Sequence, residues 1–307
     1  MPSLRQLEYL LAVDDTKHFR RAAEKLGISQ PTLSAQISSL ERNLGVQLIE
    51  RSRSRVMLTD IGQAVCLPAR RIQRDVQEIQ DITSGPKMGL GGTLKLGLTP
   101  TIAPYLLPAF IRDLHKQAPE LQLYLREEKP QLLPESLASG RYDAVILPVP
   151  IKSAELFARP LFREPLFLVA PANHAFNNGR EGIKREDLRD QTILILEEGH
   201  QLREQVVALA EDFGANLRSD YEGTSLDTLK EMVALEMGLS FLPGLYAEHS
   251  LPGDTSVNIV PLAGRALYRT IGLVWRKASG RDGEFNTIAE SVVRAVKTRF
   301  PAYHVFT

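Results

Sequence analysis

The sequence predicts an α/β protein in two parts: a small helical N-terminal part that ends in a long helix, and a larger part of alternating strands and helices. Up to about residue 83, apolar residues recur every three or four positions, as in amphipathic helices. After a glycine-rich stretch at 84–92, β-rich runs such as LKLGL and DAVILPV alternate with helical patterns. Such alternation is typical of a parallel sheet with crossover helices.

Composition indicates a globular protein of two or three domains, because the chain has 307 residues, of which 43% are hydrophobic. No apolar run approaches the roughly 20 residues of a membrane span, and Arg5 and Glu8 interrupt any signal-peptide pattern. We therefore expect a cytoplasmic protein without a membrane partner. The single cysteine, Cys66, excludes an intrachain disulfide.

Charge is balanced overall, with 37 basic and 37 acidic residues, but it is unevenly distributed. Residues 1–59 hold nine basic and six acidic side chains. This local surplus suits DNA as a partner. A surplus of three basic residues is too small to supply the affinity for DNA alone, so dimerisation and specific contacts are expected to contribute.

Residues 19–44 predict two helices joined by a tight turn. Gly27 stands where a left-handed residue ends the first helix, and Ser29 is a good N-cap for a second helix from about Gln30 to Asn43. In this helix-turn-helix geometry the second helix enters the major groove of DNA. Its outward residues are small or polar and are the predicted base contacts: Gln30, Pro31, Thr32, Ser34, Gln36 and Ser38.

An opening helix with Leu4, Leu7 and Leu10 on one face is expected to pack beneath this pair. After the pair, Arg51, Arg53 and Arg55 alternate, so on one strand they would point to the same side. We interpret them as a wing that reaches phosphates or the minor groove. The alternative is an amphipathic helix pair with a solvated basic loop. The order of the elements favours a winged helix-turn-helix domain at 1–58.

The next segment, 59–83, predicts a long helix capped by Thr59. Its apolar positions follow the 4, 3, 4, 3 spacing of a heptad seam: Val65, Ala69, Ile72, Val76 and Ile79. We expect dimerisation through this seam, and a helix packed on its own domain is the alternative. Pro68 should kink the helix or displace its start. Cys66 beside the seam is interpreted as a small buried apolar residue.

Residues 84–92 form a hinge by composition, and 93–307 the larger domain. The strands are expected at 94–98, 121–125, 143–149, 157–162, 165–171, 192–196, near Tyr221, 239–243 and 269–276. The helices are expected at 102–115, 132–139, 202–213, 226–236 and 284–299. The last strand and helix should return to the first α/β half.

Two α/β halves place a ligand cleft at the carboxyl ends of their strands. Three helix N-termini should converge there, with hydroxyl and backbone N–H groups that suit a carboxylate or phosphate. They are marked by Thr99, Pro100 and Thr101, by EEGHQLRE at 197–204, and by Thr224 and Ser225. Simple capping is the alternative for the hydroxyl residues. Arg269 could neutralise an anionic ligand or form an interlobe ion pair.

The sequence does not favour an enzyme. It has no nucleophile-elbow spacing and no glycine-rich phosphate loop, and its six histidines lack metal-ligand spacing. We expect no catalytic residues, no metal and no cofactor.

The run RRAAEKLGISQPTLSAQISSLERNLGVQLIER, preceded by LRQLEYLLAV, resembles the DNA-binding domain of LysR-type transcriptional regulators. The resemblance implies a bilobed effector domain, similar to periplasmic binding proteins, with two Rossmann-like subdomains. Lobe I would comprise 93–164 and 266–307, and lobe II 165–265. It also implies a bacterial homodimer or homotetramer that binds promoter DNA and a small-molecule effector, with RNA polymerase as a further candidate partner.

The stretches LTPTIAPYLLP, LILEEGHQLREQ, GTSLDTLKEMVALEMGLSFLP and RTIGLVWR resemble the peroxide-sensing OxyR branch of this family. That branch uses a cysteine that follows the histidine of a GHCLRDQ-type motif and a second cysteine on the same helix. Gln201 and Ala210 stand at these positions here, and Pro130 replaces a hydroxyl residue of the peroxide pocket. An amide cannot form a sulfenic acid. We therefore expect no two-cysteine peroxide chemistry.

The resemblance keeps His200, Glu204, Thr101 and Arg269 at matching positions. With Gln201 and the helix-terminus residues named above, they make the predicted site for a small polar or anionic effector that binds reversibly. Two alternatives stay open: redox sensing through Cys66, and a solute-binding α/β protein that does not bind DNA.

Overall fold

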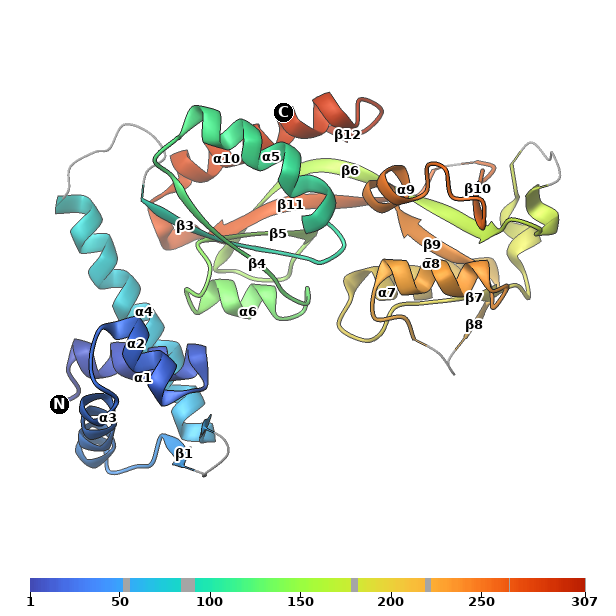
Figure 1. Cartoon of the computed structure of the whole chain (residues 1–307). Helices are drawn as coiled ribbons and strands as arrows, with labels where there is room; N and C mark the ends of the chain where they lie inside the picture. Colours follow the sequence, from blue (N-terminus) through green and yellow to red (C-terminus); the bar gives the residue numbers. More distant parts are fainter. Residues whose placement is uncertain (52–55, 84–91, 178–181, 219–221, 265, 307) are drawn as a thin grey trace. The chain divides into compact units, whose positions relative to one another are not determined.

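The computed structural model describes residues 1–51, 56–83, 92–177, 182–218, 222–264 and 266–306 (Figure 1). The chain divides into two compact units, Met1–Met88 with Ser139–Arg141, and Gly89–Ala138 with Tyr142–Thr307. Of the expected hinge, residues 84–91 lie outside the described residues.

The first unit begins with three helices, α1 (Leu4–Thr16), α2 (Phe19–Leu26) and α3 (Gln30–Leu44). The hairpin β1 (Ile49–Arg51) and β2 (Val56–Leu58) and the long helix α4 (Asp60–Thr83) follow. Gly27 and Gly45 end α2 and α3 in left-handed conformations, with φ of 66° and 70°. The helices form because their apolar faces meet in one core, in which Leu10, Leu33 and Ile37 are fully buried.

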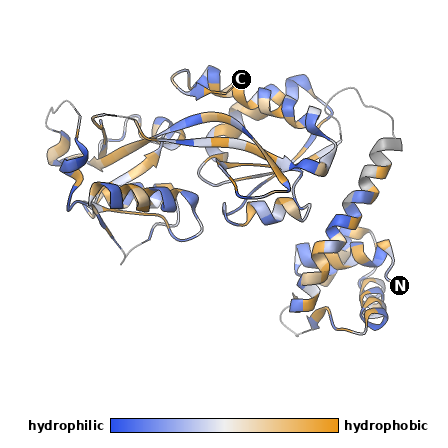
Figure 2. Cartoon of the chain, turned by 180° about the vertical axis from the view of Figure 1, so that it is seen from behind, coloured by the Kyte–Doolittle hydropathy of each residue, from blue (hydrophilic) through white to orange (hydrophobic). Residues whose placement is uncertain are grey.

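Helix α4 begins at Asp60, and the hydroxyl of Thr59 accepts a hydrogen bond from the backbone N–H of Gly62 at 3.0 Å. The predicted cap is confirmed. Pro68 lies inside the helix, so it does not displace the start. Apolar and polar residues alternate along α4, as expected for a helix with one apolar face (Figure 2).

The second unit contains the predicted parallel βαβαβ motif. Strands β3 (Thr93–Leu98), β4 (Gln122–Glu127) and β5 (Ala144–Val149) pair in the order β5-β3-β4, and α5 (Ala103–Gln117) and α6 (Leu133–Ala138) connect them. Strand β11 (Tyr268–Arg276) returns to pair antiparallel with β5, and α10 (Asp282–Arg299) packs against α5. The predicted return to the first half is confirmed.

The strands expected at 157–162 and 165–171 are one strand, β6 (Leu156–Pro171). The two expected strands lie on either side of the polar residues Arg163 and Glu164. No break separates them, because β11 pairs along this stretch and Glu164 finds a buried partner in Arg269. Beyond it, β6 pairs with β9 (Ser240–Pro243) and β10 (Val257–Val260), and β12 (His304–Val305) pairs with it from the C-terminus. Strand β6 thus belongs to both halves.

We call β3–β5, α5, α6, β11 and α10 lobe I. Lobe II consists of β7 (Thr192–Ile193), α7 (Gln201–Phe213), β8 (Asn216–Leu217), α8 (Leu226–Ala234), β9, α9 (Gly244–Ser250) and β10. Short 3-10 helices are η1 (Ala175–Asn177), η2 (Arg185–Leu188) and η3 (Lys277–Ser279). One continuous apolar core runs through both lobes, from Phe110 and Phe285 to Phe241.

Lobe II departs most from prediction. The strand expected at 192–196 shrinks to β7, which pairs in parallel with β8, and only a single bridge joins Leu196 to Gly223. The strand expected near Tyr221 lies outside the described residues. Helix α9 and strand β10 were not predicted from the sequence. Both lie against β6, and that tertiary pairing leaves no local sequence signal.

Candidate functional site

The outer face of α3 is the first candidate site. The predicted base-contacting residues Gln30, Pro31, Thr32 and Gln36 are exposed there, and Ser34 and Ser38 are half-buried. Leu33, Ile37 and Leu40 form the opposite, fully buried face. The structure thus brings all six predicted contacts to the part of α3 that is not used by the domain core.

The start of α3 is fixed by its cap. The Ser29 hydroxyl accepts from the backbone N–H of Thr32 at 3.2 Å, and the two side-chain oxygens lie 2.7 Å apart. The Thr32 hydroxyl is therefore engaged at the cap, and only part of its hydrogen-bonding capacity remains for a base or phosphate.

A residue of α1 reaches the predicted contact Gln36. Nε2 of Gln6 lies 3.5 Å from Oε1 of Gln36, and Oε1 of Gln6 accepts from the backbone N–H of Ser3 at 3.1 Å. Gln6 is buried although it is polar. From the apolar spacing of the opening helix we expected Gln6 to be exposed, on a solvated face or at a phosphate, and its burial shows that this was wrong. The capping-box pattern of Ser3 and Gln6 was the available signal.

His18 is the N-cap of α2, and its Nδ1 accepts from the backbone N–H groups of Arg20 and Arg21 at 3.2 and 3.5 Å. It orients the first turn of α2, which carries both arginines. Its position directly before a helical apolar pattern was the signal for this role.

The wing is partly described. Arg51 ends β1 and pairs with Val56 of β2. Arg53 and Arg55 lie outside the described residues, so the predicted row of three arginines remains a prediction. Glu41 of α3 fixes the base of the hairpin, because its Oε1 accepts from the backbone N–H groups of Leu48 and Ile49 at 3.0 and 3.1 Å.

Arg70 attaches the long helix to the domain. Its Nη2 lies 2.7 Å from both Oδ2 of Asp14 and Oδ1 of Asp15, and its side chain is 15% exposed. Lys25 also pairs with Asp15, at 3.1 Å. The ion pairs fix the direction in which α4 leaves the helix-turn-helix.

The predicted seam on α4 divides into two parts. Ala69 is buried and Val65 half-buried in the core of the N-terminal unit, whereas Ile72 and Ile79 are 40% and 61% exposed. The first part therefore follows the alternative, a helix packed on its own domain. Ile72 and Ile79 remain available for the predicted partner helix.

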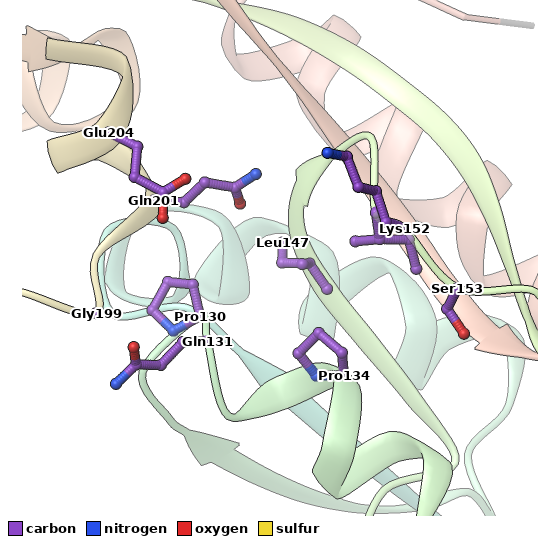
Figure 3. A pocket seen from close by; sticks show the side chains of 10 residues that line it. Pro130, Gln131, Pro134, Leu147, Lys152, Ser153, Gly199, Gln201 and Glu204 are labelled. Carbon is purple, nitrogen blue, oxygen red and sulfur yellow. The ribbon is translucent and has the colours of Figure 1, made fainter. Parts of the chain in front are cut away.

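A pocket of about 170 Å³ between the two lobes is the second candidate site (Figure 3). Lobe I and the segment after β5 supply one wall, and the start of α7 in lobe II supplies the other. The lining residues are Pro130, Gln131, Pro134, Leu147, Ile151, Lys152, Ser153, Gly199, Gln201 and Glu204.

Next to the pocket the lobes are joined by an ion pair, in which Nζ of Lys129 lies 2.8 Å from Oε1 of Glu197. His200 is buried, and its Nε2 lies 3.8 Å from that oxygen. Burial lowers the pKa of His200, which favours the neutral form of its ring. Within the described ranges, Nδ1 of His200 has no hydrogen-bond partner.

Gly199 allows the close approach of the two walls. Its φ is +91°, a conformation that favours glycine, and an added Cβ would lie 2.7 Å from Nε2 of Gln131. The OxyR-type motif GHQ at 199–201 therefore forms the lobe II wall of the pocket, with Gln201 and Glu204 as lining residues.

The other predicted effector residues lie elsewhere. Thr99 and Thr101 are buried near the end of β3, and Pro100 is half-buried beside them. Thr224 and Ser225 are exposed at the start of α8, where the Ser225 hydroxyl caps the helix by accepting from the backbone N–H of Thr228 at 3.2 Å. None of these residues lines the pocket. For Ser225, the alternative of simple capping is the observed geometry.

Arg269 is buried in an ion pair with Glu164, at 2.6 Å, and also bonds Thr101. An ion pair was one of the two predicted roles for Arg269, but the observed partner Glu164 lies on β6, the strand shared by both halves, and within the range predicted for lobe I. Sequence reasoning missed Gln131, Lys152 and Ser153 as pocket residues. Lys152 and Ser153 follow the carboxyl end of β5, where parallel sheets place ligands, and this was the available signal.

None of the helices in the described ranges combines the length and apolar character needed to cross a bilayer. In the same part of the chain, no three His, Cys, Asp or Glu side chains gather as metal ligands.

Two family profiles match the chain: a bacterial regulatory helix-turn-helix protein of the lysR family at residues 4–63, and the LysR substrate binding domain at 87–297. The chain is 39% identical over 291 residues to the DNA-binding transcriptional dual regulator OxyR of Escherichia coli K12, and covers 94% of both chains. It is 33% identical over 298 residues to the HTH-type transcriptional regulator EstR of Acinetobacter baylyi, covering 97% of this chain and 98% of EstR.

Among solved structures, a cysteine-to-aspartate variant of full-length OxyR from Pseudomonas aeruginosa matches with a TM-score of 0.79 at 33% identity, covering 94% of each chain. A peroxide-bound OxyR variant from Corynebacterium glutamicum gives 0.67 at 30% identity, covering 97% of this chain and 94% of that one. The relatives are regulators and not enzymes. The chain therefore belongs to the LysR family of DNA-binding transcriptional regulators and is closely related to OxyR.

Proposed function

We propose that this regulator is controlled by a small polar effector that binds reversibly in the pocket between the lobes. The observation that carries the proposal is Gln201, which lines this pocket at the position where the peroxide-sensing motif has its reactive cysteine. The pocket is smaller than the roughly 300 Å³ at which sites for drug-sized ligands begin. The effector should accordingly be a small metabolite.

Peroxide chemistry by the two-cysteine route has no support in this chain. Gln201 offers an amide in place of a thiolate, and Ala210, at the second position, is a fully buried methyl group in α7. Cys66 is buried in the N-terminal unit, and burial raises its pKa to about 12. A redox role for Cys66 is therefore disfavoured as well.

On the DNA side, we propose that the exposed face of α3 reads bases, with Gln30, Pro31, Thr32, Ser34, Gln36 and Ser38 as contacts. Arg51, Arg53 and Arg55 would contact the DNA backbone or minor groove.

The exposed Ile72 and Ile79 support a dimer through α4, and contacts between effector domains would complete a tetramer. Effector binding would change how two such arms span promoter DNA, and RNA polymerase would respond to that change.

The effector proposal is tested with the full chain and a labelled promoter fragment. A metabolite panel is screened for compounds that raise the melting temperature, and each is then tested for its effect on DNA affinity. Gln201→Leu should abolish both responses but leave ligand-free DNA binding intact. Gln122→Leu, an exposed glutamine on β4 that does not line the pocket, is the control. If peroxide treatment abolished DNA binding in the wild type and also in Cys66→Ser, the proposal would be contradicted.

The DNA-contact proposal has its own test. Arg53→Ala should weaken binding to all sequences and flatten the salt dependence, because it removes a phosphate contact. Gln30→Ala or Ser34→Ala should instead change the sequence preference. Unchanged DNA binding in all three variants would refute the assignment of these residues.

A further inference from the structure

The pocket carries one basic and one acidic side chain on opposite walls. Lys152 follows β5 in lobe I, and Glu204 lies in the first turn of α7 in lobe II. Figure 3 shows the side chains of Lys152 and Gln201 pointing toward one another across the pocket, with Glu204 next to Gln201. We propose that the effector is a small dipolar molecule, with a carboxylate bound by Lys152 and an ammonium group bound by Glu204. This inference rests on the proposed function.

Both charges are available to a ligand. Across the part of the chain that the structure describes, neither Lys152 nor Glu204 forms an ion pair or hydrogen bond with another residue. The nearby charges are different, because Lys129 and Glu197 already neutralise each other at 2.8 Å. The pocket therefore presents two separated, opposite charges.

A ligand that carries a single charge fits this arrangement poorly. An anion at Lys152 would also meet the negative charge of Glu204 in the same pocket, and a cation at Glu204 would meet the positive charge of Lys152. A neutral polar ligand would gain hydrogen bonds from these groups but no charge–charge attraction. A molecule that carries both charges is attracted by both walls, and it would also hold the lobes together, because the walls belong to different lobes.

The uncharged polar groups suit the middle of such a molecule. Gln201, Gln131 and Ser153 line the pocket, and within the described chain their side chains have no hydrogen-bond partners. They offer amide and hydroxyl donors and acceptors between the charged ends. Together with the volume of about 170 Å³, this favours amino acids with small or polar side chains.

The test uses the full chain and the twenty standard amino acids, together with β-alanine, which widens the charge spacing, and glycine betaine, which keeps the spacing of glycine but has no N–H donors. Each amino acid that raises the melting temperature is titrated calorimetrically beside its two single-charge analogues, for example alanine beside ethylamine and propionate. We expect at least one amino acid to bind, and both analogues to bind at least about tenfold more weakly.

Variants assign the charges. Lys152→Gln and Glu204→Gln should each weaken binding of the amino acid by about tenfold or more. The double variant Lys152→Glu with Glu204→Lys should recover part of that affinity. Lys116→Gln and Glu290→Gln are matched controls, since both residues are exposed on lobe I helices and neither lines the pocket.

Three results would overturn the dipolar effector: no member of the panel binds, a single-charge analogue binds as well as its amino acid, or the Lys152 and Glu204 variants bind normally. A change in ligand-free DNA binding by both variants would indicate a direct Lys152–Glu204 bridge instead. If a singly charged or neutral metabolite binds and Gln201→Leu abolishes that binding, the dipolar inference fails and the proposed function stands. If no metabolite acts and Gln201→Leu matches wild type, the proposed function fails.

Discussion

Arg269 and Glu164 stand opposite each other on β11 and β6, with Nε of the arginine 2.6 Å from Oε2 of the glutamate and both side chains buried. The guanidinium also donates to the hydroxyl and the carbonyl oxygen of Thr101 in lobe I, at 3.0 and 3.2 Å. Oε1 of Glu164 accepts from the backbone N–H of Leu245 in lobe II at 2.9 Å. The pair therefore connects both lobes at the strand they share.

Breaking this pair should destabilise the second unit strongly. Arg269→Met leaves a buried carboxylate without a counter-charge, and the expected loss in the free energy of unfolding is about 3–5 kcal/mol. Glu164→Leu with Arg269→Met should cost less, because no buried charge remains. Urea unfolding measures both. Arg185→Met is the control, since its pair with Asp212 is exposed and should contribute less than about 1 kcal/mol. A double variant as unstable as the single one would refute this account.

The Glu164 position shows where sequence reasoning fails. Alternation and helix caps are local, so they predicted α3, its cap Ser29, the end at Gly27 and the parallel strands of lobe I. A buried glutamate in mid-strand depends on a partner 105 residues away, which no local pattern reveals. The split of β6 was predicted for that reason, although the strand is continuous.

The pocket shows the same division. Gln201 and Glu204 were predicted because a continuous motif carries them. Lys152 and Gln131 belong to connecting segments without a motif, and only the folded chain brings them opposite α7. The convergence of three helix N-termini was expected from topology. Of these three helices the structure places α7 at the pocket, because Ser225 at the start of α8 and Thr101 in the turn before α5 use their polar groups internally.

The Arg70 ion pairs should make the N-terminal unit sensitive to acid. Burial raises the pKa of Asp15. The charge and hydrogen bond of Arg70, with a smaller contribution from Lys25, lower it by more than burial raises it, so the pKa lies below its ordinary value of 3.8. The stabilisation is therefore present above pH 3.8 and is lost as the pH falls through the lowered pKa of the folded state.

Replacing Arg70 with Met should reduce this acid dependence. Between pH 5 and pH 3 the melting temperature of the N-terminal unit should fall more steeply in the wild type than in Arg70→Met, which is already destabilised at pH 7. Circular dichroism melts of the full chain over this range provide the comparison, with Arg71→Met as control because Arg71 is exposed. Parallel pH curves for wild type and Arg70→Met would contradict the role of the pair.

Helix α4 approaches the start of the hairpin through Gly62. A Cβ added there would meet the backbone carbonyl oxygen of Leu48, which cannot move aside as a flexible side chain could. Gly62→Ala should therefore cost about 1–3 kcal/mol by overpacking, despite the better helix propensity of alanine. Gly283→Ala in α10 is the matched control, because nothing lies within 4 Å of its added Cβ. Thermal unfolding should show destabilisation for Gly62→Ala only, and equal effects would refute the close approach.

Cys66 should be inert in the folded protein. Burial, with the neighbouring Asp14 charge, raises its pKa to about 12, so at pH 8 only about one thiol in ten thousand is ionised, against about one in four for a free cysteine of pKa 8.5. Iodoacetamide labelling followed by mass spectrometry should accordingly be slow in the native state and fast in urea. Hydrogen peroxide should leave DNA affinity equal in wild type and Cys66→Ser. Rapid native labelling, or a peroxide response that Cys66→Ser removes, would restore the redox alternative, because either result requires a thiolate that this buried position does not favour.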